Sequence, residues 1–428
     1  LVTECSVTKR KKMNILKHDK NQNTKEKILI ATLNASVKKI KNPYSLCNIA
    51  KDVGISKPAI FKYFCCKDNL IKVATSKAFD DIAAIYIQIK NQYDSDTAKI
   101  IQYFSLWLLK NPSHLSFIFN QFMMEKNFSN IVVTELCSRG VELKKDFLSP
   151  EGIKEVYVIF SVVTLMSCLL NHYKNELSEI SEKQYEDFAF GISKCICYGV
   201  RNYSDNIEIN YNSLDEIYQQ RKQEFYENLK KSESVHDINQ CKNQERFFLA
   251  LTKVVKKYSF SGVTIEKLAE EAGLAKSSLY TWFKNKDDLL EKVILGKFLQ
   301  LKNLIEYNIK SFENVVEKSY IILKTETDWL LENISVLPVA TWLNFSGHGT
   351  TNIGEILISN SNWVSKIFSV DALGLVDSDL PAIWLTCLPV PVVLEGNSKG
   401  YSNQFLLNSV KQIHSMLWNG ILNINEEN

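Results

Sequence analysis

Apolar residues recur at three- and four-residue spacing along most of the chain, which is the pattern of amphipathic helices. Near the start, Ile28, Leu29 and Leu33 fall on one face of a helix expected to begin near Thr24. Glycine and proline account for only 15 and 8 of the 428 residues, so few positions interrupt helices. The pattern predicts an all-α protein.

The sequence contains a long internal repeat. A shift of 219 residues places residues 49–55 over residues 268–274 without a gap, and the match continues as far as Leu70 and Leu289. A shift of 222 residues then aligns residues 107–111 (WLLKN) with residues 329–333 (WLLEN). A period of this length indicates duplicated domains and not a solenoid of short repeats.

Both copies predict a short helix, a tight turn and a further helix behind a first amphipathic helix. In copy one, helices over residues 44–52 and from Ser56 to about Phe64 flank Gly54, and glycine tolerates the positive φ of such a turn. In copy two, helices are expected over residues 245–258, 264–271 and 276–283, with the turn at Gly273. A helix-turn-helix of this kind places its last helix in the major groove of DNA.

The segments GISKPAIFKYFCCKDNL and GLAKSSLYTWFKNKDDL resemble the recognition region of the TetR family, an aromatic-x-aromatic-Phe sequence followed by Lys-acidic-x-Leu. The resemblance implies two tandem all-helical units, each a reading head followed by a helical body that binds a ligand and dimerises. It further implies a sequence-specific, DNA-binding transcriptional regulator that acts as a ligand-responsive repressor. An interaction or scaffold protein, in which one or both heads no longer bind DNA, stays open as the alternative.

The resemblance also assigns DNA contacts residue by residue. The expected groove-facing residues are Lys57, Pro58, Ala59, Phe61 and Lys62 in copy one, and Lys276, Ser277, Ser278, Tyr280 and Thr281 in copy two. Backbone contacts fall to Tyr63, Lys67, Trp282 and Lys286, and to the helix-capping hydroxyls of Ser45 and Thr264. Phe61 and Tyr280 fit core packing equally well. Because the heads share only Lys57 and Lys276 among groove-facing residues, we expect an asymmetric operator. Replacement of the cap Ser56 by Ala275 predicts a loss of about 1 kcal/mol in copy two.

The net charge of +3 is distributed unevenly along the chain. Residues 1–75 carry 16 Lys or Arg against 5 Asp or Glu, residues 242–300 carry 11 against 7, and the remainder is acidic. Basic heads on an acidic body fit a protein that presents particular faces to phosphate.

Other classes of protein lack sequence support. The chain has no glycine-rich phosphate loop, nucleophile elbow, HExxH or CxxC motif, so we expect no enzyme, cofactor or metal site. Its ten cysteines fit reduced thiols in a cytoplasmic protein. The longest apolar stretch, residues 156–170, is shorter than the roughly 20 residues of a membrane span.

The expected domains follow from the repeat. They are a basic arm at 1–23 (with Met13 as an alternative start to Leu1), heads at 24–74 and 242–294, bodies at 75–201 and 295–428, and a linker at 202–241 with a helix over 213–231. The expected dimerisation helices cover 155–171 and 183–200 in one body, and 380–394 and 402–418 in the other. Pro381, Pro389 and Pro391 predict that the 380–394 helix is kinked or broken.

Two questions stay open at this level. The two copies can pair within one chain as a pseudo-dimer, or whole chains can form a homodimer. A small apolar or aromatic inducer is expected in a body, with candidate lining residues Trp107, Phe117, Phe122, Trp329, Trp342 and Phe345. Aromatic residues at helical spacing are equally typical of a core.

Overall fold

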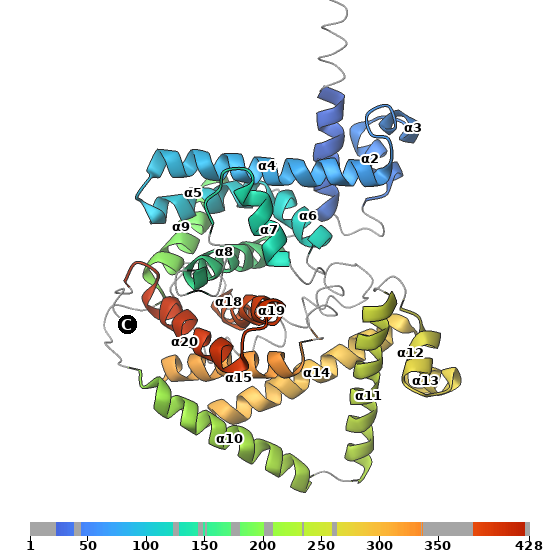
Figure 1. Ribbon diagram of the computed structural model, residues 1–428, viewed down its shortest axis with the longest axis vertical. Coiled ribbons are helices and arrows are strands. Elements are labelled where there is room, and N and C mark those ends of the chain that lie inside the picture. Colours follow the sequence, from blue (N-terminus) through green and yellow to red (C-terminus); the bar gives the residue numbers. More distant parts are fainter. Residues whose placement is uncertain are drawn as a thin grey trace, which may run out of the picture.

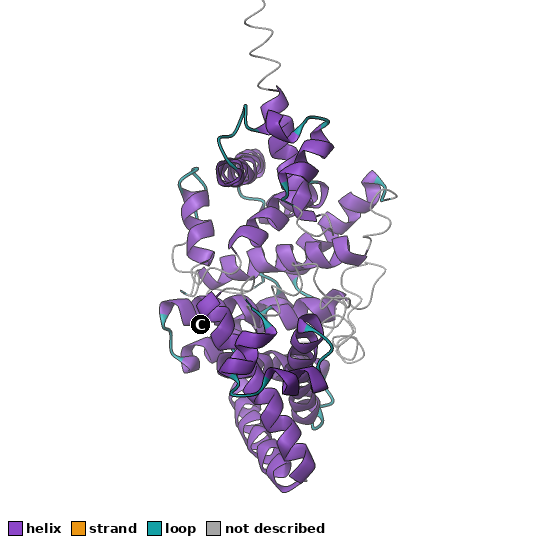
Figure 2. Cartoon of the chain, turned by 90° about the vertical axis from the view of Figure 1, so that its right-hand side faces the viewer, coloured by secondary structure: helices purple, strands orange, loops and turns teal. Residues whose placement is uncertain are grey.

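The computed structural model describes residues 23–37, 44–122, 128–143, 149, 152–172, 180–200, 209–232, 235–258, 263–334, 336 and 380–423. All regular structure in these segments is helical, which confirms the all-α prediction (Figure 2). None of these helices is long and apolar enough to cross a membrane. The predicted arm before residue 23, and the ligand candidates Trp342 and Phe345, lie outside the described residues.

The first half of the chain builds head one and a helical body behind it. It begins with a helix over residues 23–34 that continues into the 3₁₀ helix η1 (Ala35–Val37). The helices that follow are α2 (Leu46–Val53), α3 (Lys57–Ile60), α4 (Lys67–Tyr93), α5 (Thr97–Lys110), α6 (Pro112–Phe122), α7 (Phe128–Cys137), α8 (Gly152–His172) and α9 (Glu182–Tyr198).

The second half has a similar order of helices. They are α10 (Tyr211–Ser232), α11 (Val235–Tyr258), α12 (Ile265–Glu271), α13 (Lys276–Trp282), α14 (Lys286–Ile309), α15 (Val315–Glu332), α18 (Leu380–Cys387), α19 (Pro389–Lys399) and α20 (Asn403–Asn419). The series α2 to α5 corresponds to α12 to α15, and α9 and α20 are each 17 residues long. In both halves the last helix packs on the helix that carries the WLL sequence, α9 on α5 and α20 on α15.

One helix break agrees with the sequence expectation, whereas two helix starts differ from it. The helix predicted over 380–394 is broken at Leu388, between α18 and α19, as the prolines indicated. The linker helix α10 begins at Tyr211, and its N-terminal cap is Asn210, whose side chain accepts a hydrogen bond from the Ser213 amide at 3.1 Å. Helix α11 begins at Val235, so it extends into the segment assigned to the linker.

The linker helix α10 is fastened to the second half of the chain. Asp215 forms one ion pair with Lys324 and another with Lys411, each at 2.8 Å. Further along α10, Arg221 donates to the carbonyl of Tyr307 at 2.6 Å. These contacts hold α10 against α14, α15 and α20.

The two halves share one hydrophobic core. A continuous cluster of buried residues extends from Ile101 in α5 to Ile421 after α20, whereas head one has its own cluster. Helix α8 packs against α18 and α20 at this junction. Tyr157 donates to the Met416 carbonyl at 3.2 Å, and Trp384 Nε1 donates to Ser161 Oγ at 2.9 Å. Figure 1 shows that both heads, α2–α3 and α12–α13, lie on the same side of the resulting molecule.

The ends of α9 and α20 cross at two glycines. Gly199 and Gly420 have φ of +78° and +72° with extended ψ, a region that is essentially restricted to glycine. Beside them, the Val200 amide donates to the Leu417 carbonyl at 2.9 Å and the Ile421 amide donates to the Ile196 carbonyl at 3.0 Å. A Cβ atom on Gly199 would overlap the Trp418 carbonyl, so only glycine allows this pairing of the two halves.

We expect Gly199→Ala to lower the free energy of unfolding by about 3 kcal/mol or more, because the methyl group meets backbone in a glycine-only conformation. Gly400→Ala is the matched control. Gly400 also has a positive φ, +72°, but its Cβ would meet nothing within 4 Å, and we expect a loss of only about 1 kcal/mol. Urea unfolding of both variants measures the difference. Equal losses would contradict a tight crossing.

Candidate nucleic-acid interface

Head one is ordered by a cap and a glycine turn. The Ser45 hydroxyl accepts a hydrogen bond from the Asn48 amide at 3.2 Å and so begins α2. Helix α2 ends at Val53 and is followed by Gly54 with φ of +73°, and the Ile55 amide donates back to the Ala50 carbonyl at 2.9 Å. Ser45 therefore caps the second helix, as expected.

Head two repeats this geometry with different residues. The Thr264 hydroxyl accepts from the Lys267 amide at 3.3 Å at the start of α12. Gly273 has φ of +62°, and the Leu274 amide donates to the Ala269 carbonyl at 2.8 Å. In both heads a glycine turn closed by one backbone hydrogen bond therefore joins the second helix to the third.

The third helices differ from expectation in two respects. Helix α3 ends at Ile60 and passes into a turn, so it is shorter than the predicted helix to Phe64, whereas α13 continues to Trp282. The Ser56 side chain makes no capping hydrogen bond, and neither does Ala275 at the same position of head two. The cap loss predicted for Ala275 was therefore wrong, because copy one has no side-chain cap there to lose.

Most of the expected contact residues with described side chains lie at the surface. The exposed residues are Lys57, Pro58, Phe61, Lys62, Lys67, Lys276, Ser277 and Tyr280, and the half-buried ones are Ser45, Ala59, Tyr63, Thr264 and Ser278. Phe61 is 47% exposed and Tyr280 is 49% exposed, so neither belongs to the core. The side chains of Thr281, Trp282 and Lys286 lie outside the described part.

The hydrophobic residues behind these surfaces are buried. Phe64 and Leu70 are at most 2% exposed in head one, and Phe283 and Leu289 are at most 8% exposed in head two. The aromatic-rich motif therefore divides into exposed aromatic side chains and a buried phenylalanine that anchors the turn.

One charged pair at the surface of head two was not anticipated from the sequence. Lys276 forms an ion pair with Glu266, from α13 to α12, and its Nζ lies 5.7 Å from the centre of the Tyr280 ring. The hydrogen bond from Lys276 lowers the pKa of Glu266 to about 2. The position of Glu266 is occupied by Cys47 in head one. Equivalent lysines in the two heads therefore have different electrostatic surroundings.

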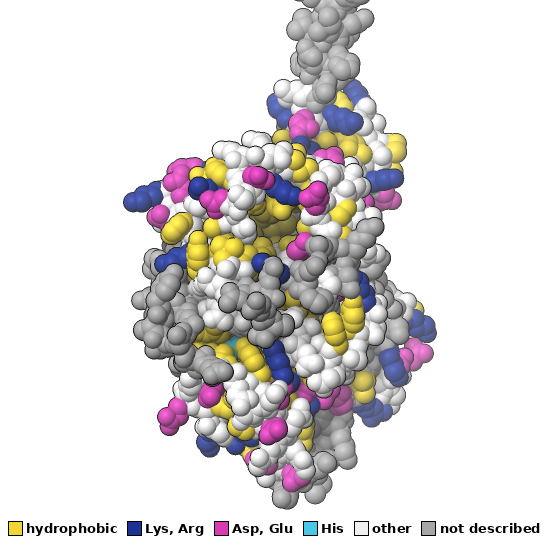
Figure 3. All heavy atoms as spheres, turned by 60° about the vertical axis from the view of Figure 1, so that its left-hand side comes forward, with side chains coloured by type: hydrophobic (Ala, Val, Ile, Leu, Met, Phe, Trp, Pro, Cys, Tyr) yellow, Lys and Arg dark blue, Asp and Glu magenta, His cyan; other side chains and the backbone are white. Residues whose placement is uncertain are grey.

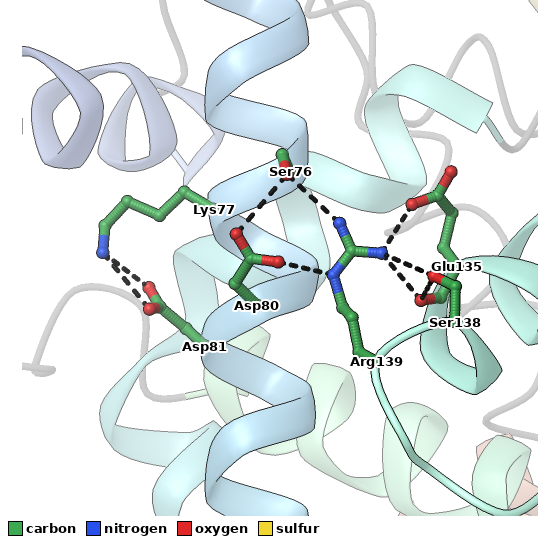
Figure 4. Close-up of polar contacts among 7 residues, drawn as sticks. All are labelled: Ser76, Lys77, Asp80, Asp81, Glu135, Ser138 and Arg139. Atoms are coloured by element: carbon green, nitrogen blue, oxygen red, sulfur yellow. Dashed lines mark hydrogen bonds and ion pairs between the residues drawn. The ribbon is translucent and has the colours of Figure 1, made fainter.

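A polar network fixes the long helix α4 to the body (Figure 4). Arg139, in the turn after α7, donates to Asp80 at 2.6 Å and to Ser76 at 3.1 Å. Its other guanidinium nitrogen contacts the Glu135 carboxylate at 2.7 Å. Because Ser76 and Asp80 lie one turn apart on α4, a single arginine holds that face of the helix.

The same turn of α4 also contacts head one. Lys77 forms ion pairs with Glu26 of the first helix at 2.7 Å and with Asp81 at 3.0 Å. His114 of α6 lies 3.0 Å from Asp81. Burial opposes ionisation of Asp81, but the hydrogen bonds from His114 and Lys77 prevail and lower its pKa. This chain of contacts connects the first helix of head one to α6 of the body.

A pocket of about 430 Å³ lies at this junction between head one and its body. Its wall combines Ile30 and Leu33 of the first helix with Lys77 of α4, Trp107 of α5 and His114 of α6. Its polar groups also include Lys110 and Asp81.

The other candidate ligand residues lie elsewhere in the described structure. Phe117 is fully buried in the core of head one, with its ring centre 5.5 Å from that of Tyr44, and Phe122 packs on the same core. Trp329 is 4% exposed in the larger core. Trp107 is thus the predicted ligand residue that borders this pocket. Among the described residues, no group of three or more His, Cys, Asp or Glu could hold a metal ion.

Several solved structures resemble part of the chain. The fatty acid degradation regulator FadR from Bacillus halodurans is 20% identical over 42% of this chain and 97% of its own, with a TM-score of 0.36. FadR from Bacillus subtilis in complex with stearoyl-CoA is 19% identical over 41% and 98%, with a TM-score of 0.35. A TetR-family regulator from Haemophilus influenzae is 18% identical over 41% and 96%, with a TM-score of 0.30.

No curated protein sequence matches the chain. The model of the family of bacterial regulatory proteins known as the tetR family matches residues 250–293. This segment contains the end of α11, all of α12 and α13, and the start of α14, so the match falls on head two as described above. The chain therefore carries a TetR-type helix-turn-helix at residues 250–293. This match supports a function as a DNA-binding transcriptional regulator.

Proposed function

We propose that this regulator reads one asymmetric operator with both heads of a single chain, as an intramolecular pseudo-dimer. The observation that carries the proposal is the core shared by the two halves, closed by the crossing of Gly199 and Gly420. Both heads lie on the same side of the molecule (Figure 1). A rigid pair of heads on one side suits contact with successive turns of one duplex, about 34 Å apart.

The surface chemistry of the heads supports a different half-site for each. Lys57 and Lys276 begin α3 and α13, where a lysine can donate to guanine O6 and N7. Their neighbours differ, with Pro58 and Ala59 in one head and Ser277 and Ser278 in the other. Apolar groups favour a thymine methyl group whereas hydroxyls bond to base edges or phosphate, so the two heads prefer different sequences.

The left-hand side of Figure 1 carries charges of both signs. In Figure 3, which brings forward the left-hand side of Figure 1, lysine and arginine side chains are scattered among aspartate and glutamate over the described surface. Interspersed charges of both signs produce little net attraction for a polyanion. This surface supports an approach of DNA from the side of the heads.

Footprinting with single variants tests the two-headed operator. We expect Lys57→Ala and Lys276→Ala each to weaken protection of the same site by about tenfold, each at a different half, because each removes one base or phosphate contact. Lys99→Ala is the control, since Lys99 is an exposed lysine at the start of α5, away from both heads. The mass of the complex should correspond to one 49.1 kDa chain bound to one duplex.

Other outcomes would identify the alternatives. A stable mass of two chains, kept on dilution, would replace the pseudo-dimer by a homodimer. Binding that does not weaken as salt rises would favour the interaction-protein alternative, because phosphate contacts release counterions.

The Glu266–Lys276 pair gives a second prediction. We expect Glu266→Gln to tighten DNA binding by about threefold to tenfold at low salt, because it removes a carboxylate that competes with phosphate for Lys276. Cys47→Glu introduces the same carboxylate into head one and should weaken binding there. Titration of labelled operator at two salt concentrations measures both. Weaker binding by Glu266→Gln would mean that the ion pair positions Lys276 for DNA.

We also propose that the junction pocket is an effector site for a small aromatic acid. The volume of about 430 Å³ is within the usual range for ligand sites. Trp107 offers a ring surface, and Lys77 and Lys110 offer cationic groups for a carboxylate. A carboxylate that bonds to Lys77 competes with Glu26, and so loosens the link between the first helix of head one and α4. Copy two has Gly296 at the position of Lys77, and there the next residue, Lys297, pairs with Glu245, the equivalent of Glu26.

Tryptophan fluorescence with 2-naphthoate as the probe tests this site. We expect saturable quenching in the parent chain and in Trp329→Phe, but a clear loss of the ligand-dependent signal in Trp107→Phe. Trp329 is the matched control because it occupies the equivalent WLL position in copy two. Quenching that persists unchanged in Trp107→Phe would place the ligand elsewhere.

A further inference from the structure

Head one carries two adjacent cysteines on its surface. Cys65 and Cys66 are both exposed and both free thiols, and their Sγ atoms lie 3.8 Å apart. They follow the short recognition helix α3 and come directly before α4. The equivalent positions of head two are Lys284 and Asn285, so the dithiol belongs to one head alone.

This pair differs from the other closely spaced thiols of the described chain. Cys195 and Cys197 lie two residues apart in α9 but are fully buried, and burial raises their pKa values to about 12 and about 11. Such thiols are inert, because a reagent must reach the sulfur and the thiolate is the reactive form. Cys65 and Cys66 are open to solvent and to any reagent in it.

The pair also occupies a structural position at the start of α4. Cys66 Sγ accepts a hydrogen bond from the Asn69 amide at 3.4 Å, and Asn285 makes the equivalent bond with the Asp288 amide at 2.9 Å in head two. The loop lies between Tyr63 and Lys67, which are the expected DNA-backbone contacts of head one.

The geometry favours capture of an atom between the sulfurs over a disulfide. Disulfides usually join residues with Cα atoms about 4.4–6.8 Å apart, whereas neighbouring Cα atoms across a trans peptide are about 3.8 Å apart. The described residues contain no cis peptide bond. By contrast, two exposed sulfurs 3.8 Å apart can both bond to one shared atom after a small change in their side-chain torsions.

A metal ion needs more ligands than this loop offers. No third His, Cys, Asp or Glu joins the pair in the described structure. Structural zinc takes four ligands, so two thiols do not complete its shell. An electrophile that already carries one organic substituent and needs two sulfurs is matched to the pair.

We propose that Cys65 and Cys66 form a capture site for monosubstituted trivalent arsenicals. With an arsine oxide, R–As=O, the two S–H bonds and the As=O bond break and two As–S bonds form. Both thiol protons leave with the oxygen as water, and arsenic remains trivalent. The Cys65 thiol donates a hydrogen bond to Cys66, so the two adjacent thiols together hold both protons that leave with the oxygen.

Capture has a consequence for DNA that rests on the proposed function. The arsenic and its substituent occupy the loop between Tyr63 and Lys67, where a phosphate would approach. They also engage the sulfur that caps α4. Head one therefore binds DNA more weakly, while DNA binding by head two, which has Lys284 and Asn285 at these positions, is unaffected.

The test uses the full chain and phenylarsine oxide. The mass of the treated protein is measured first, and its DNA binding is measured afterwards. We expect one adduct for each chain, mapped to the peptide that contains residues 65 and 66. It should persist in a monothiol such as glutathione and be removed by a small dithiol. Cys65→Ser and Cys66→Ser should each abolish that stable adduct. Cys47→Ser, which alters another exposed thiol of the same head, should keep it.

DNA binding is then measured on the adduct. We expect protection of the head-one half-site to weaken by about tenfold, with no change in Cys66→Ser treated in the same way. An adduct that maps elsewhere, or that survives in Cys65→Ser, would overturn the capture site. A correct adduct with unchanged DNA affinity would overturn its coupling to the head. Absence of DNA binding before treatment would count against the proposed function. The adduct mass would still test the capture site, because it does not depend on DNA binding.

Discussion

The close approach of the chain at Gly199 and Gly420 is the constraint on which the arrangement of the two halves depends. At this point the backbone of one half supplies hydrogen-bond donors to carbonyls of the other, and no side chain fits between them. Backbone pairing of this kind has one register, because shifting α9 against α20 by a residue would leave buried amides and carbonyls unpaired. The positions of α4 and α14, and thus of the heads that they carry, follow from that register.

The sequence predicted the heads better than the bodies because the heads are defined by local interactions. Each head depends on residues that act within a few positions of their partners, namely the caps Ser45 and Thr264, the turn glycines and the buried Phe64. Their spacing in the sequence is therefore enough to predict the heads. Ser56 shows the limit of this reasoning, because a hydroxyl at a cap position forms no bond unless its rotamer and the local backbone permit one.

The junction pocket and the crossing glycines were beyond prediction from the sequence. Trp107 and Ile30 border one cavity although they are far apart in the chain, and only tertiary packing brings them together. Gly199 looked like an ordinary residue after a helix, since its close contact comes from a segment more than two hundred residues away. The exposed ion pair of Glu266 and Lys276 was similarly hidden, because it depends on the angle between α12 and α13.

The docked linker helix α10 has a consequence for how the chain responds to its own abundance. Asp215 and Arg221 hold α10 on the second half, so only residues 201–208 separate the described end of the first half from the segment docked on the second. Partners joined in this way meet at a fixed effective concentration that does not fall when the protein is scarce. A regulator assembled from separate subunits must first associate, and its occupancy of DNA then rises steeply with concentration. In a single chain with both halves attached, occupancy would rise in simple proportion from the first molecules made.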